Sequence, residues 1–100
     1  MPEMHFIVQW PAGDQMRCYS PSLIVREYLQ VGGRYPVEEF VARSRAMLNI
    51  ASERVKAKYG YICTAALDQL AEIEARAAAQ PPSVAFVTVV AFELPEEAPP

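Results

Sequence analysis

A run of apolar residues near the C-terminus, residues 83–92, constrains the fold of this 100-residue chain more than any other feature. The run is rich in β-branched residues and is apolar on both faces, which is typical of a strand covered on two sides. Left exposed, such a strand would pair with other chains and aggregate. The rest of the chain must therefore supply neighbouring strands and a cover for it.

An N-terminal hairpin is the best source of a neighbouring strand. Phe6, Val8 and Trp10 alternate with polar residues, as in a half-buried strand. After a Pro-Ala-Gly-Asp turn, Met16 and Cys18 continue the alternation. We expect these two segments to pair in an antiparallel hairpin across the turn.

Residues 22–31 allow two interpretations. Ser20-Pro21 is typical of a helix start, because the serine hydroxyl can accept from a free amide and proline has its φ preset. That signal predicts a short helix from Pro21 to about Leu29. The alternation of apolar and polar residues over 23–31 would instead suit a third strand.

Two further helices are predicted to follow. The first begins at Pro36 and runs to about Tyr59, with Gly60 as the residue that ends it. Its core-facing positions recur at helical spacing: Val37, Val41, Ser44, Leu48, Ala51 and Val55, with Phe40 and Met47 beside them. The second helix begins at Thr64 and runs through Ala79, with an apolar stripe of Ala66, Leu70, Ile73 and Ala77.

These elements predict an α+β domain of order ββαααβ. The hairpin and the C-terminal strand would form a small antiparallel sheet with two or three helices on one face. We expect one domain over residues 1–93 and a disordered Pro/Glu-rich tail over 94–100. A homodimer formed through the sheet would cover the second face of the last strand.

Composition narrows the range of partners and locations. The net charge is −3 and the signs are interspersed, so we expect no nucleic-acid binding. The N-terminus lacks a secretory pattern and the longest apolar run is too short for a membrane helix, which favours a soluble cytoplasmic protein. Cys18 and Cys63 are expected to be reduced thiols, and neither a metal nor a cofactor is expected.

Three groups of residues are candidates for chemistry or binding. Cys63 precedes a predicted helix N-terminus, which would lower its thiol pKa and suit a nucleophile, although a buried structural cysteine is the simpler interpretation. Arg54 and Lys58 share a helix face near Tyr59 and could hold an anionic group. Alternatively, they are a solvated helix end. The hydroxyl cluster of Tyr19, Ser20 and Ser22 could bind an anion at a helix start or simply cap it.

Several segments together resemble a family of short bacterial proteins, the nitrogen starvation response protein family. They are residues 18–23 (CYSPSL), 35–41 (YPVEEFV), 51–55 (ASERV) and 58–60 (KYG). The resemblance covers residues 4–76. It implies a bacterial gene cluster that includes a nitrilase-family enzyme, and it supplies no biochemical activity for the small protein.

Two hypotheses follow for function. The first is a non-catalytic binding or regulatory protein of nitrogen metabolism that partners an enzyme of that cluster or binds a small anionic metabolite. The second is a small homodimeric enzyme that uses Cys63, with a site near Tyr19, Arg54 and Lys58. We favour the first, because His5 is the only histidine that could serve Cys63 as a base.

Overall fold

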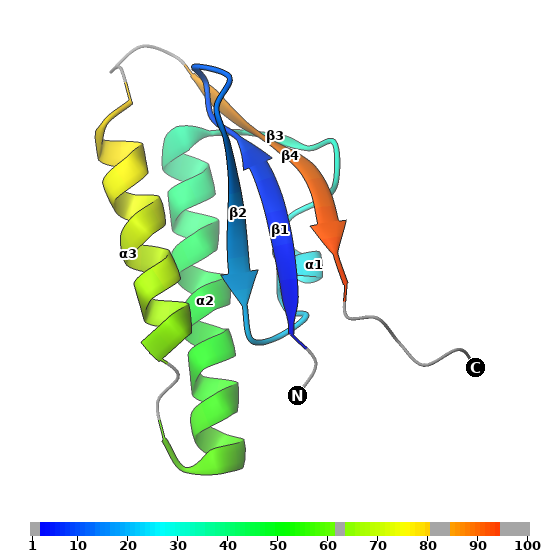
Figure 1. The fold of residues 1–100 in the computed structure, drawn as a ribbon, viewed down its shortest axis with the longest axis vertical. Helices are drawn as coiled ribbons and strands as arrows, with labels where there is room; N and C mark the ends of the chain where they lie inside the picture. The colour runs from blue at the N-terminus through cyan, green and yellow to red at the C-terminus, as the bar shows by residue number, and fades with distance from the viewer. Residues whose placement is uncertain (1–2, 62–63, 81–84, 95–100) are drawn as a thin grey trace, which may run out of the picture.

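The computed structural model describes residues 3–61, 64–80 and 85–94, and it has the α+β architecture predicted from the sequence. The four strands form one antiparallel sheet in the order β2-β1-β4-β3, and the helices lie on one side of it (Figure 1). The elements are β1 (Met4–Gln9), β2 (Gln15–Ser20), α1 (Val25–Tyr28), β3 (Arg34–Pro36), α2 (Val37–Tyr59), α3 (Thr64–Ala78) and β4 (Phe86–Glu93).

The hairpin prediction is confirmed. β1 and β2 pair antiparallel, with Phe6 opposite Cys18 and Val8 opposite Met16, so the predicted apolar positions share the inner face. The turn closes when the Trp10 amide donates to Asp14 O at 2.8 Å. The Trp10 ring is buried against Phe40 of α2 in an edge-to-face contact with centroids 5.6 Å apart.

β4 returns beside β1, as expected for the last strand. Val87 and Val89 are fully buried against the helices, while Phe86, Thr88 and Ala91 are half-buried on the opposite face. The register shifts by one residue between Val89 and Ala91, and this places an extra residue in the strand. Residues 83–84, where the predicted strand begins, lie outside the described residues.

Two details of the chain between β2 and α2 differ from prediction. The segment has a short helix, but it covers only Val25–Tyr28, and Ser20 does not cap it. Ser20 Oγ instead accepts from the Ser22 amide and donates to Ser22 O, which holds a local turn. In addition, Arg34–Pro36, for which no strand was predicted, forms the edge strand β3 by pairing with residues 86–88 of β4.

The long helices match their predictions within one residue. α2 ends at Gly60, whose φ of 80° is left-handed and whose amide donates to Lys56 O. The core positions of α2 include Phe40, Met47 and Leu48, all fully buried. α3 buries Ala66, Leu70 and Ile73. Among the described residues, the helices are too short or too polar to cross a membrane.

The predicted C-terminal tail begins at Leu94, which is half exposed. Residues 95–100 lie outside the described residues, as does Cys63. The division into a domain and a tail therefore stays a prediction.

Candidate functional site

The connection between β2 and β3 crosses over α2, and two arginines of that helix hold it. Arg54 Nη1 donates to Ser22 Oγ at 2.9 Å, near the start of the connection. Arg43 Nη1 donates to Tyr28 O at 2.6 Å, at the end of α1. Because a guanidinium carries several donors in a rigid plane, each arginine can hold this connection and still present N–H groups elsewhere.

The first of these contacts joins two of the candidate groups proposed from the sequence. Ser22 is 2% exposed, and its Oγ accepts from both Arg54 and the Ile24 amide. Ser20, fully buried, belongs to the same turn. The hydroxyl cluster and the basic helix face therefore meet at Arg54, although the serine oxygens are already engaged in bonds that stabilise the turn.

The remaining candidates lie around this contact. The Tyr19 amide donates to Gln69 Oε1 at 2.9 Å and its hydroxyl donates to Glu3, so Tyr19 links β2 to α3 and to the N-terminal residues. Lys58, one turn beyond Arg54, places its Nζ 5.5 Å from the centroid of the Tyr59 ring. That any of these residues binds a ligand stays a prediction.

The two cysteines cannot be compared directly, because Cys63 lies outside the described residues. Cys18 is fully buried, and this burial raises its pKa to about 12. The negative charge of Glu72 adds to the rise and Arg76 opposes it. A thiol with such a pKa stays protonated at neutral pH and is unsuited to nucleophilic attack.

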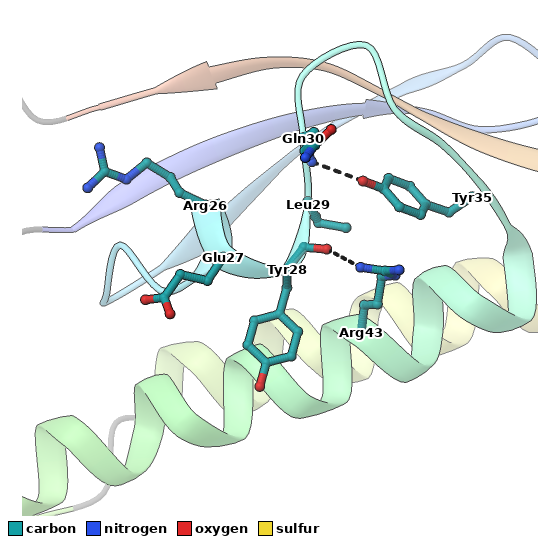
Figure 2. A pocket seen from close by; sticks show the side chains of 7 residues that line it. All are labelled: Arg26, Glu27, Tyr28, Leu29, Gln30, Tyr35 and Arg43. Atoms are coloured by element: carbon teal, nitrogen blue, oxygen red, sulfur yellow. Dashed lines mark hydrogen bonds between the residues drawn. The ribbon is translucent and has the colours of Figure 1, made fainter.

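A pocket of about 300 Å³ opens beside the second arginine contact (Figure 2). Residues 26–30 form one wall, Tyr35 of β3 forms another, and Arg43 of α2 forms the floor. Leu29 is 1% exposed and supplies an apolar surface, while the other lining residues are polar or aromatic.

Arg43 is held in a fixed orientation at this pocket. Its Nε contacts Glu39 Oε2 at 3.1 Å, and its guanidinium carbon lies 4.8 Å from the centroid of the Tyr35 ring. Together with the bond to Tyr28 O, these contacts restrain the guanidinium on three sides. A charged group restrained in this way loses little conformational entropy when it binds an anion.

Tyr35 is held as firmly as Arg43. Its hydroxyl accepts from the Gln30 amide at 3.0 Å, a bond that closes the β3 side of the pocket (Figure 2). A Cβ on Gly33 would lie 2.7 Å from Tyr35 Oη, so only glycine leaves room for the hydroxyl there. The pocket wall therefore depends on a close approach between the turn before β3 and the Tyr35 side chain.

Sequence reasoning did not find this pocket. It gave no role in a site to Tyr28 or Tyr35. The available signal was the sequence Gly-Gly-Arg-Tyr-Pro at 32–36, where paired glycines precede an aromatic residue. Such glycines mark a close backbone approach as well as a chain break.

The fold and these contacts define a small two-layer α+β protein, with an antiparallel sheet on one side and helices on the other. The family model described as nitrogen starvation-induced protein NitG matches residues 5–92, and the chain belongs to this family. Searches of curated proteins and of solved structures found no significant match. The family indicated by the sequence resemblance is thereby confirmed.

Proposed function

We propose that this protein acts in nitrogen starvation as a non-catalytic binding or regulatory protein of the cytoplasm, and that it associates with its partner through the outer edge of β4. The family match supports the physiological setting. The observation that carries the binding role is an incompletely paired strand. β3 pairs only with residues 86–88 of β4, and the turn at Gly32 and Gly33 reaches no further than Val89.

Beyond Val89, the same edge of β4 has no neighbouring strand among the described residues. Large apolar side chains are exposed along this part of the molecule. Val90 is 39% exposed, Leu94 is 49% exposed and Val31, which precedes the Gly32 contact, is 55% exposed. An open strand edge with apolar side chains is the usual template for adding a strand from another chain.

On the opposite edge of the sheet, one backbone amide of β2 is already occupied. There Gln69 of α3 accepts the Tyr19 amide hydrogen, so a helix side chain takes the place of a neighbouring strand. The contrast between the two edges supports assigning the interaction to β4 and not to β2.

A second copy of the chain is the occupant that we favour. Two antiparallel edges related by a two-fold axis are complementary to each other, so residues 90–94 of both copies could pair and bury Val90 and Leu94. An enzyme of the nitrogen-starvation response, of the kind implied by the family resemblance, would use the same edge if it contributed an extended segment.

The experiment compares a lysine substitution at Val90 with one at Leu67, because the two native residues are equally exposed. Val90→Lys places a charge at the proposed interface, and Leu67→Lys places it on α3, where the side chain is also 39% exposed. Size-exclusion chromatography with light scattering should give a dimer for the native chain and for Leu67→Lys, and a monomer for Val90→Lys.

A pull-down from nitrogen-starved cells with the same three proteins tests the enzyme partner. Recovery of one enzyme by the native chain and by Leu67→Lys, but not by Val90→Lys, would mean that this enzyme binds at the β4 edge. A native monomer that recovers nothing specifically would refute the proposal.

The alternative of a small homodimeric enzyme requires Cys63, Tyr19, Arg54 and Lys58 to act together. Its supporting observation is the contact between Arg54 and Ser22, which lies in the turn directly after β2, the strand that carries Tyr19. Complementation of a strain lacking the native gene with Cys63→Ala decides the matter, since a normal nitrogen-starvation response by that variant would remove the enzymatic role.

A further inference from the structure

We infer that the exposed end of α2 is a docking surface for an acidic, proline-containing segment, and that the C-terminal tail of the same chain, residues 94–100, occupies it. The surface consists of Lys58, Tyr59 and Tyr61, which together form the α2 tip. The tip lies apart from the β4 edge, so the docking does not depend on the association proposed for that edge.

The last turn of α2 extends beyond the end of the sheet (Figure 1). Val55 is the last buried residue of the helix, and Tyr59, one turn further along the same side, is 48% exposed. Tyr61 is 62% exposed. The centroids of the two tyrosine rings are 5.9 Å apart, and the ring planes are tilted by 31°. Adjacent exposed aromatic rings are typical of a contact surface for another segment.

The charge of the tip selects the kind of segment that it fits. Lys58 places its Nζ 5.5 Å from the centroid of the Tyr59 ring, and it forms no ion pair with any residue that the structure describes. Arg54 lies four residues earlier on the same helix face, where two positive charges repel each other. A positive surface with aromatic rings therefore fits a segment that combines carboxylates with apolar rings.

The tail has this composition. It reads Leu-Pro-Glu-Glu-Ala-Pro-Pro, with two glutamates, three prolines and no basic residue. Residues 53–61 carry three basic residues and one acidic residue, so the two segments are complementary in charge. Prolines dock on aromatic side chains in polyproline recognition, and their fixed φ reduces the conformational entropy that is lost on docking.

The tail leaves the sheet at the end where β2 leads to α2. Glu93 lies opposite His5, and His5 lies opposite Tyr19, so the end of β4 is two strand spacings, about 10 Å, from Tyr19. Three residues after Tyr19, Ser22 Oγ accepts from Arg54 of α2. An extended segment of this length spans up to about 23 Å, which allows the tail to pass the two strands and contact the last turn of α2.

The test is NMR spectroscopy of the full isotope-labelled chain. We expect nuclear Overhauser effects between proline protons of the tail and ring protons of Tyr59 or Tyr61. The amides of Glu96 and Glu97 should be more ordered, by ¹⁵N relaxation, than those of a synthetic peptide of residues 94–100. Tail amides that relax like the peptide, with no contacts to the rings, would overturn the inference.

Two further comparisons separate this docking from association between copies. The docked fraction should be the same in dilute and in concentrated protein, and an increase with concentration would mean that the tail docks on another copy and would overturn the inference. The same docked fraction is expected in Val90→Lys, so the result holds whether or not the β4 edge associates.

Three variants of the full chain locate the contact. Lys58→Gln should lower the ratio of docked to free tail by about two- to fivefold, the usual effect of one exposed ion pair, and Glu96→Gln with Glu97→Gln should lower it at least as much. Tyr61→Ser should also release the tail, and it should fold normally because the native ring is exposed. An ordered tail that none of these variants releases would dock elsewhere and would refute the tip as its site.

Lys56→Gln is the matched control. Lys56 lies in the same turn as Lys58 but two residues away, so its side chain lies on another face of the helix. The substitution makes the same change in net charge and should leave the docked fraction unchanged. Equal release of the tail by Lys56→Gln and Lys58→Gln would show a nonspecific effect of charge and would refute the site.

Discussion

The buried thiol of Cys18 should make the stability of this protein fall at alkaline pH. The pKa of Cys18 rises from 9.0 to about 12 in the folded chain, because burial on the inner face of β2 disfavours the thiolate. Above its ordinary pKa the thiol ionises in the unfolded chain but not in the folded one. Raising the pH therefore favours unfolding, and the loss of stability ends only at the folded pKa.

The magnitude follows from proton linkage. Each pH unit between the two pKa values costs about 1.4 kcal/mol, so stability should decrease by about 2 kcal/mol between pH 8 and about pH 10.5. The free energy of unfolding of most domains is about 5 to 15 kcal/mol, so this decrease is a large part of it. Contributions from other titrating groups accompany it and must be removed by comparison.

Urea denaturation of the native chain and of Cys18→Ala, measured at several pH values, isolates the contribution of the thiol. The variant loses some stability at every pH because of the cavity, but its dependence on pH should be shallower by about 2 kcal/mol over this range. Identical pH dependence in the two proteins would show that the folded environment does not disfavour the thiolate, and the reasoning would fail.

Two other substitutions test single features of the fold. Arg54→Gln removes the donor to Ser22 and should lower the free energy of unfolding by about 1 kcal/mol. The control Lys56→Gln, on the same helix, should change it little, and equal effects of the two variants would mean that the contact does not stabilise the fold. Gly60→Ala should lower the free energy of unfolding by about 1 kcal/mol, because an alanine is strained at the φ of 80°. An unchanged stability would mean that α2 ends in another conformation.

The parts of the fold that the sequence predicted are those with local signals. The β1–β2 hairpin follows from alternation on either side of a turn, and α2 follows from its apolar spacing between Pro36 and Gly60. β3 has no comparable signal, since it has three residues and ends in a proline. Its strand character comes from pairing with β4, far along the chain, and from an edge position that tolerates proline.

The predicted start of α1, at Pro21, was wrong for a different reason. Serine before proline suits a helix cap, but the same hydroxyl can bond its own neighbourhood, and Ser20 does so by closing a turn with Ser22. Whether the serine caps a helix or closes a turn depends on which side chains of other elements contact this segment. Here Arg54 donates to Ser22 and stabilises the turn, a contact over 32 residues of sequence that no local pattern contains.

In the candidate site, too, local features could be predicted from the sequence and contacts between distant segments could not. Arg54 and the serines were selected separately from their own surroundings, and the structure brings them together. The pocket at Arg43 was not predicted, because its walls come from α1, β3 and α2 and none has a distinctive sequence by itself.

The pocket and the open edge of β4 are joined by one short segment, residues 30–33. Gln30 bonds to Tyr35 in the pocket wall, and the Gly33 amide donates back to Gln30 O at 2.9 Å. From the same turn, the Gly32 amide donates to Val89 O at 2.7 Å, at the point where the free edge begins. One turn therefore contacts both the pocket wall and the strand where the free edge begins.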